Sequence, residues 1–171
     1  MAELADQETM IRVMMDIEAI KKLKYKFYRC LDNKLWDDIT ECLAENVTAS
    51  FYGGKFKFEG VDALMRFLKE GLIPARISVH HGHHPEIEIT GDTTATGIWS
   101  VQTYVIDRQA NISLSGVSLF HDEYVKEEGE WKIKSTACSR IYEEVWDRGE
   151  IKSLKLTQAK EFESSDGQCK G

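Results

Sequence analysis

The second half of the chain contains four long runs of strand-like sequence that are separated only by short turn signals. The runs cover about residues 76–90, 93–107, 112–126 and 130–143. Such short connections predict antiparallel neighbours, because a parallel pair of strands needs a crossover of roughly a dozen residues or more. The sequence therefore predicts an antiparallel meander, and we expect strands of this length to form a strongly curved sheet.

The first half of the chain is mainly helical in pattern. Apolar residues spaced three and four apart predict helices over about residues 8–31, 35–43 and 61–72, and a hairpin is predicted at 47–52 and 55–58. Helices that precede an antiparallel sheet define an α+β fold. Because a curved sheet cannot bury both of its faces, we expect the concave face and the helices to enclose one cavity.

Length and charge limit the domain organisation and the partners. The 171 residues suit one domain, expected over residues 9–147, with a flexible N-terminus over 1–8 and a C-terminal extension over 148–171 whose end is disordered. A net charge of −7 without a long basic run disfavours a nucleic-acid partner. No stretch reaches the roughly 18 unbroken apolar residues of a membrane span.

The cysteines and the N-terminal charges favour a cytoplasmic protein. None of the four cysteines belongs to a C-x-x-C pair, so a zinc or thioredoxin-type site is not expected. Acidic and basic residues interrupt any apolar run of signal-peptide type near the N-terminus. We therefore expect free thiols in a reducing compartment.

Four of the five histidines are concentrated in the segment RISVHHGHHP, residues 76–85. On a regular strand His80 and His84 share one face, while His81 shares the other face with the apolar residues. Strict alternation therefore places His81 on the buried side. A bulge within GHHP reverses that assignment, and the pattern alone leaves both possibilities open.

Several chemical roles are open for these histidines and for two distant residues. A histidine here is a general base, a metal ligand, or a residue without a chemical role. A metal site is not favoured, because alternation divides the histidines between two faces. Asp32, at the junction of two predicted helices, is a helix cap or a carboxylate that points into a cleft. Arg140, late in the last strand, is a surface charge or an anchor for an anionic group.

Several segments of the chain resemble the SnoaL-like group of the nuclear-transport-factor-2-like superfamily. These segments are IEAIKKLK, RCLDNKLWD, HHGHHPEI, TTATGIW and RIYEE, and the similarity extends over about residues 17–146. The chain resembles the bile-acid 7-alpha-dehydratases of this group and, more distantly, scytalone dehydratase. The resemblance implies a cone-shaped α+β barrel, with N-terminal helices packed on a strongly curved, mostly antiparallel sheet. It also implies a homo-oligomer, with a trimer favoured over a dimer.

The resemblance implies roles for individual residues. It makes His80 the general base, Asp32 the carboxylate partner of His80, and Arg140 an anchor in the pocket. Phe27 stands where the dehydratases have a pocket tyrosine, and Thr103 stands where they have a carboxylate. The neighbouring Tyr28 is expected to face elsewhere on its helix. The candidate substrate-binding residues are Arg140, Tyr28, Phe27, Thr103, Tyr52 and Tyr104.

The expected activity is that of a lyase that works without cofactor or metal. It would eliminate water from a hydroxylated, carbonyl-activated hydrophobic ring, steroid-like or polyketide-like, by general acid–base catalysis with His80 and Asp32. A coenzyme A thioester is one form that this hydrophobic small molecule could take. Two alternatives stay open: a double-bond isomerase that uses the same pair, and a non-catalytic protein that binds a small molecule.

Overall fold

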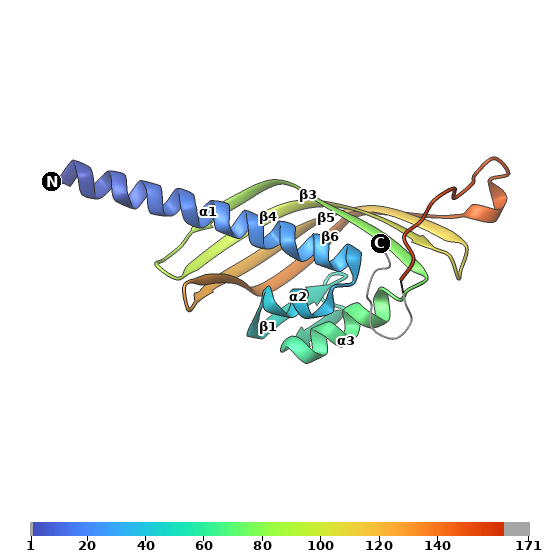
Figure 1. Cartoon of the computed structure of the whole chain (residues 1–171), viewed down its shortest axis with the longest axis horizontal. Coiled ribbons are helices and arrows are strands. Elements are labelled where there is room, and N and C mark those ends of the chain that lie inside the picture. Colours follow the sequence, from blue (N-terminus) through green and yellow to red (C-terminus); the bar gives the residue numbers. More distant parts are fainter. Residues whose placement is uncertain (1, 163–171) are drawn as a thin grey trace.

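The computed structural model describes residues 2–162 and places one curved sheet against three helices (Figure 1). The helices are α1 (Ala2–Asn33), α2 (Trp36–Glu41) and α3 (Val61–Gly71), and a short 3-10 turn, η1, covers Arg148–Glu150. The strands are β1 (Leu43–Phe51), β2 (Phe56–Glu59), β3 (Arg76–Ile89), β4 (Thr94–Asp107), β5 (Ile112–Glu127) and β6 (Glu130–Asp147). The predicted α+β fold with N-terminal helices on a curved, mostly antiparallel sheet is confirmed.

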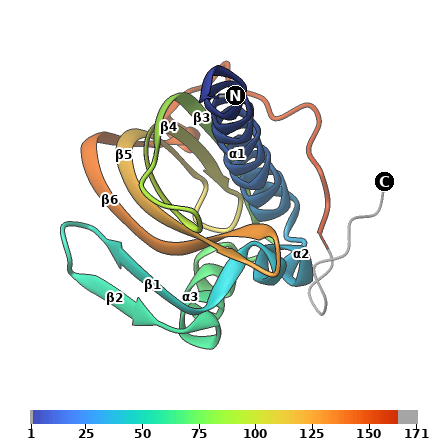
Figure 2. The ribbon, with the colours of Figure 1, turned by 90° about the vertical axis from the view of Figure 1, so that its left-hand side faces the viewer.

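The six strands form one sheet in the order β2-β1-β6-β5-β4-β3. Strands β3 to β6 form the predicted antiparallel meander, and β1 pairs with β2 as the predicted hairpin. The one parallel pairing joins β1 to β6, with Thr48 opposite Ser135 and Ser50 opposite Ala137. Figure 2 shows the sheet curving around the interior, with α1 beside β3 and with α3 next to the β1–β2 hairpin.

Helix α1 is longer than predicted and has two different halves. It is helical from Ala2, whereas the sequence predicts a helix that begins only at about residue 8. The first half extends away from the sheet, and Met14 and Met15 are exposed there (Figure 1). The second half is packed on the sheet and buries Ile20 and Leu31. None of the described helices is both long enough and apolar enough to cross a bilayer.

Strand β3 contains a bulge between His83 and Glu86, where the alternation of its side chains between the two faces of the sheet is reversed. Before the bulge, His80 lies on the concave side and His81 is exposed. After the bulge, Ile87 packs against the core. Because the bulge adds a residue to one strand, it reverses the alternation, and this explains why strict alternation assigns the wrong histidine to the cavity.

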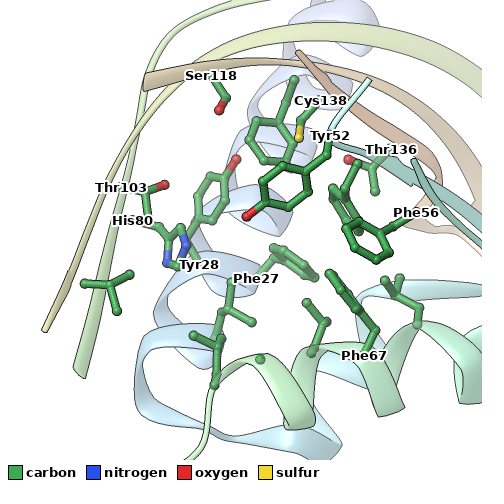
Figure 3. Close-up of a pocket in the computed structure, with 18 of the residues that line it drawn as sticks. Phe27, Tyr28, Tyr52, Phe56, Phe67, His80, Thr103, Ser118, Thr136 and Cys138 are labelled. Atoms are coloured by element: carbon green, nitrogen blue, oxygen red, sulfur yellow. The ribbon is translucent and has the colours of Figure 1, made fainter. Parts of the chain in front are cut away.

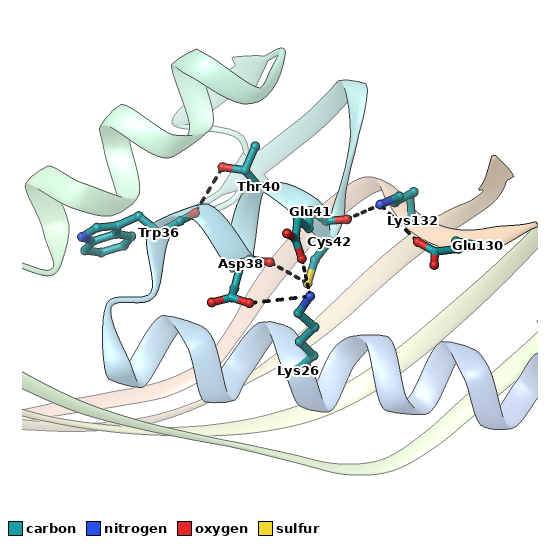
Figure 4. Close-up of polar contacts among 8 residues, drawn as sticks. All are labelled: Lys26, Trp36, Asp38, Thr40, Glu41, Cys42, Glu130 and Lys132. Atoms are coloured by element: carbon teal, nitrogen blue, oxygen red, sulfur yellow. Dashed lines mark hydrogen bonds and ion pairs between the residues drawn. The ribbon is translucent and has the colours of Figure 1, made fainter. Parts of the chain in front are cut away.

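Polar contacts hold the corner between α1 and α2 (Figure 4). Lys26 of α1 lies 2.7 Å from the carboxylate of Glu41 and 3.8 Å from that of Asp38. The hydrogen bond to Glu41 raises the pKa of Lys26. Lys132 of β6 donates to the carbonyl of Glu41, and the thiol of Cys42 donates to the carbonyl of Asp38. The end of α1 is thereby tied to both α2 and the sheet.

The C-terminal extension returns to the end of α1. Phe162 is buried, and the Nζ of Lys34 lies 3.9 Å from the centroid of its ring. Lys160 donates to the side chain of Asn33, and Arg108 is paired with Glu161 at 2.6 Å. The disordered end that the sequence predicts covers residues 164–171, which lie outside the described part of the chain.

Candidate active site

Asp32 and His80 are joined by two hydrogen bonds. The Nδ1 of His80 lies 2.6 Å from Oδ1 of Asp32, and the backbone N–H of His80 donates to Oδ2 at 2.9 Å. The hydroxyl of Ser78 also donates to Oδ1, at 2.9 Å. The carboxylate therefore connects to β3 through three bonds and does not cap a helix. Both side chains of the pair are largely buried, at 13% exposure for His80 and 18% for Asp32.

The local structure at the end of α1 directs Asp32 towards β3. Lys34 adopts a φ of 56°, in the left-handed region where glycine is usual, and its N–H donates to the carbonyl of Leu31. Its Nζ donates to the carbonyl of Arg76 at 2.9 Å. This contact attaches the helix end to the first residue of β3. The distance between Asp32 and His80 is thereby set by the backbone as well as by their side chains.

The pairing defines which nitrogen of His80 is available for chemistry. A carboxylate is only an acceptor, so when Asp32 is ionised and the imidazole is neutral, Nδ1 of His80 carries the hydrogen and Nε2 carries the lone pair. The imidazole lines the cavity between α1 and the sheet (Figure 3). The arrangement can therefore accept a proton from a ligand in the cavity and return it.

The cavity has a volume of about 510 Å³ and is lined mainly by apolar side chains. Five phenylalanines from five different elements contribute to the lining: Phe27, Phe51, Phe56, Phe67 and Phe120. Polar side chains on the sheet side include Thr103, Ser118 and Thr136 (Figure 3). A wall of this kind suits a hydrophobic ring that carries a few oxygens.

The structure brings most of the predicted substrate-binding residues to this cavity. Phe27, Tyr28, Tyr52, Thr103 and Arg140 all line it, and Thr103 pairs with His80 in the β3–β4 register. The expectation that Tyr28 faces elsewhere on its helix is wrong. Its ring lies parallel to the imidazole of His80, with 6.0 Å between the centroids and 8° between the planes.

Tyr104 is the one predicted substrate-binding residue that the structure places outside the cavity lining. Its neighbours Thr103 and Val105 point into the cavity, so alternation directs Tyr104 to the opposite face of β4. There its hydroxyl donates to Ser113 at 3.3 Å, and its ring contacts that of Trp146. Tyr104 therefore lies apart from the cavity that the other predicted substrate-binding residues line.

Arg140 lies at the cavity wall together with its own counter-ion. Its Nη2 is 3.0 Å from a carboxylate oxygen of Glu143, which also lines the cavity. The guanidinium lies 5.3 Å from the ring centroid of Tyr52. Beneath it, Gly116 provides the space, because a Cβ at that position would be 2.9 Å from Nη1 of Arg140. An anionic ligand group at Arg140 would compete with Glu143.

Sequence reasoning missed a buried ion pair in the cavity wall. Lys24 is 1% exposed, and its Nζ lies 2.6 Å from Oδ2 of Asp122. Asp122 also accepts hydrogen bonds from Tyr124 at 2.8 Å and from Thr136 at 2.7 Å. Neither charge is marked by its sequence context, because both belong to segments rich in charged residues. Within residues 2–162, no three side chains of His, Cys, Asp or Glu are placed to hold a metal ion.

Comparisons with known proteins bear on the fold of this chain. The fold is similar to that of a provisionally assigned scytalone dehydratase from Novosphingobium aromaticivorans DSM 12444, at 20% identity over 77% of this chain and 87% of that chain, with a TM-score of 0.72. It is also similar to hexachlorocyclohexane dehydrochlorinase LinA-type3 from Novosphingobium barchaimii LL02, at 14% identity over 87% and 99%, with a TM-score of 0.74. The TM-scores show that the fold is shared, and because the sequence identities are low, these two similarities concern the fold alone. The model of the SnoaL-like domain family matches residues 12–137, and the chain therefore belongs to that family.

Proposed function

We propose that this protein is a lyase, a dehydratase that removes water from a hydroxylated hydrophobic ring activated by a carbonyl group. The ring is of steroid or polyketide type, and the reaction uses neither cofactor nor metal. The observation that carries the proposal is the hydrogen-bonded pair of His80 and Asp32 at the wall of an aromatic cavity. Its volume of about 510 Å³ falls in the range of small-molecule sites.

The chemistry follows from the tautomer that Asp32 imposes on His80. Nε2 of His80 removes a proton from the carbon next to the carbonyl, and the carboxylate of Asp32 stabilises the imidazolium that forms. The imidazolium then returns the proton to the departing hydroxyl, which leaves as water. One base serves both steps, so the proton and the hydroxyl leave from the same face of the ring. General acid–base catalysis of this kind contributes about two to four orders of magnitude in rate.

Other cavity residues bind the substrate in this proposal. Phe27 and Tyr52 contact the ring, and Thr103 contacts a polar group close to the reacting carbon. Arg140 anchors an anionic or strongly polar group, in exchange for its contact with Glu143. A coenzyme A thioester is one substrate form that would supply such a group.

The proposal extends to assembly and location. We expect a homotrimer, and what supports self-association is the exposure of Ile141 and Val145 on β6. Sedimentation of the purified protein measures the number of copies.

A cytoplasmic location accords with the free thiols of Cys30, Cys42 and Cys138.

The test uses a panel of ring hydroxy-ketones and of chlorinated cyclohexanes, with products identified by mass. The protein is compared with its His80→Ala and Asp32→Asn variants, and His81→Ala serves as the matched control because His81 is exposed on the same strand. We expect the unmodified protein to remove one water from a hydroxy-ketone. Turnover should fall about 10²- to 10⁴-fold in His80→Ala and in Asp32→Asn, the two variants of the His80–Asp32 dyad, and should be normal in the control.

Other results would point to the alternatives. A product of unchanged mass that requires both His80 and Asp32 would identify a double-bond isomerase. A ligand that binds equally well to both dyad variants and is not converted by the unmodified protein would identify a binding protein. Turnover that survives both substitutions would exclude the mechanism.

A further inference from the structure

An exposed apolar patch lies on one face of the N-terminal half of α1. Its members, called the α1 patch below, are exposed by 57% to 68%: Met10, Ile11, Met14 and Met15. Successive residues of a helix are about 100° apart, so these four side chains share one side of the helix. A contiguous exposed apolar patch marks an interaction site, and methionine adapts well to such contacts.

The sheet does not cover this part of α1. Every residue from Asp6 to Arg12 is exposed, and burial begins only at Ile20 in the part of the helix whose side chains the structure describes. Figure 1 shows the helix continuing past the sheet towards the N-terminus. A helical segment of this length is only marginally stable in water without packing. The α1 patch is therefore a surface that a partner would stabilise.

The charges on either side of the α1 patch have opposite signs. Glu8 precedes the patch, Lys22 follows it, and both are exposed. Glu8, Met15 and Lys22 are seven residues apart, about two helical turns, so they lie along one line of the helix surface. This line therefore has an acidic end, an apolar middle and a basic end.

Other charges near the α1 patch are already paired within the chain. Glu18 lies 3.8 Å from Lys21, and Arg12 lies 3.6 Å from Asp92 in the turn between β3 and β4. Among the residues that the structure describes, by contrast, no ion pair engages Glu8 or Lys22. These two charges are the ones that remain for a partner.

We propose that the α1 patch binds the α1 patch of a second copy of this chain, with the two helices antiparallel. In this direction Glu8 of each copy faces Lys22 of the other, and the two Met15 side chains meet near a two-fold axis. In a parallel pair Glu8 would face Glu8 and Lys22 would face Lys22, which is unfavourable. Because each copy uses the same surface, the contact closes as a dimer.

The size of the contact sets the expected strength of the dimer. The line from Glu8 to Lys22 is about 21 Å long, since a helix rises about 1.5 Å per residue. One pair of helices of this length makes an interface at the small end of the known range, so we expect a reversible dimer. The inference is independent of the proposed function. In a homotrimer assembled through β6, the same helix pair would link one trimer to another.

An exchange of charges tests the direction of the two helices. Sedimentation velocity over a range of protein concentrations measures the association that doubles the mass. At low salt we expect Glu8→Lys and Lys22→Glu each to weaken this association about 5- to 50-fold, because each places like charges together at both ends of the contact.

The double variant Glu8→Lys, Lys22→Glu should recover the association of the unmodified protein. The two residues are about 21 Å apart in one helix, so recovery arises only from pairing between copies. A double variant that associates as weakly as the single variants would overturn the inference.

A substitution within the α1 patch tests the apolar contact. We expect Met14→Glu to weaken the doubling of mass about 10- to 100-fold, because the charge would be buried between the two helices. Its urea midpoint at low protein concentration should be unchanged, since Met14 is 68% exposed and glutamate favours a helix. Ile151→Glu, at an exposed apolar residue of the C-terminal extension, is the control. Unchanged association of Met14→Glu would contradict the proposed surface.

Disulfide cross-linking locates the two-fold axis. In a Cys169→Ser background, mild oxidation should link Met15→Cys into a covalent dimer and leave Glu8→Cys unlinked. The two copies of residue 8 would be about 21 Å apart in an antiparallel pair, whereas a disulfide requires Cα atoms within about 7 Å. Efficient cross-linking of Glu8→Cys, without cross-linking of Met15→Cys, would indicate a parallel pair and overturn the inference.

A lipid surface is the alternative occupant that the measurements distinguish. Vesicles of phosphatidylcholine and phosphatidylglycerol are sedimented with the unmodified protein and with Met14→Glu. We expect neither protein to be carried down, because the acidic residues beside the α1 patch are repelled by an anionic surface. Binding that the unmodified protein shows and Met14→Glu loses, together with a mass that does not double at any concentration, would overturn the inference in favour of a membrane.

Discussion

Gly82 and Tyr28 are in direct contact across the interface between β3 and α1. A Cβ added to Gly82 would lie 2.9 Å from Cε2 of Tyr28 and 3.2 Å from Cε3 of Trp99. Cβ atoms do not come this close to the carbon atoms of a ring, so only glycine lets the tyrosine lie on the strand. The glycine within the histidine segment is therefore explained by the close approach of a ring two residues after His80.

Replacing Gly82 with alanine should disturb this contact. We expect Gly82→Ala to lower the free energy of unfolding by about 1–3 kcal/mol, because both rings it meets are buried and cannot move freely. Urea denaturation measures the change. Gly71→Ala is the control, since a Cβ there meets nothing within 4 Å. Equal stability of the Gly82→Ala variant and the unmodified protein would contradict this account of the contact.

The ion pair of Lys24 and Asp122 should be costly to break on one side only. We expect Lys24→Met to destabilise the protein by about 3–5 kcal/mol, because it leaves the carboxylate of Asp122 buried without its counter-charge. The exposed Lys22→Met is the control. In the double variant Lys24→Met, Asp122→Asn, the loss should be smaller than the sum of the two single losses. Additive losses would show that the two charges are not coupled.

Asp107 should contribute to stability in a pH-dependent way. Burial alone would raise the pKa of this carboxyl, but hydrogen bonds from the N–H groups of Ala110 and Gln109 and the ion pair with Arg76 outweigh it and lower the pKa. A group with a lowered folded-state pKa stabilises the fold above its unfolded-state pKa. That stabilisation is lost as the pH falls through the folded-state pKa.

Replacing Asp107 with asparagine should therefore change the acid side of the stability curve. At pH 7 we expect Asp107→Asn to cost about 1–3 kcal/mol, the range for a buried charged hydrogen-bonding group. Below the unfolded-state pKa the difference from the unmodified protein should shrink. Urea denaturation at a series of pH values measures it, with the exposed Asp37→Asn as control. A difference that stays constant down to the lowest pH would exclude this ionisation as its source.

Ser78 should act on catalysis through Asp32. Its hydroxyl donates to the same carboxylate oxygen that binds His80. Loss of this hydroxyl therefore removes one of the three hydrogen bonds that orient Asp32. On the proposed function, Ser78→Ala should lower kcat about 3- to 10-fold, well short of the loss in Asp32→Asn, and leave KM unchanged. Steady-state kinetics on a converted hydroxy-ketone decide this. A larger effect on KM than on kcat would point to substrate binding instead.

Local patterns predict most of the strands, because alternation and turn residues act over short distances. The four runs of the meander agree with β3 to β6 within a few residues, whereas β1 begins at Leu43 and not near residue 47. Leu43 continues the apolar spacing of the preceding helix, but it pairs with Ile133 of β6. That parallel pairing joins distant parts of the chain, and no local sequence pattern predicts it.

The site shows the same division between local and distant information. Alternation cannot choose between His80 and His81, because the choice depends on a bulge whose position is fixed by pairing with β4. The resemblance to a known family pointed to His80 and Asp32, and the structure joins these two residues by a hydrogen bond. Tyr28 was misplaced because the burial of a helix residue depends on what packs against it, here a glycine on a strand more than fifty residues later.

The bulge in β3 divides the strand into two parts that differ in their tolerance of insertions and deletions. Up to His83, which pairs with Ser100, the register is continuous and delivers His80 to Asp32. Beyond Glu86 a new register begins. A lineage that gained or lost a residue in the tip beyond the bulge would reshape the far end of the sheet and leave the hydrogen-bonded contact between His80 and Asp32 in place. If the proposed function holds, the strand thus has one part that this chemistry requires and another that is free to vary.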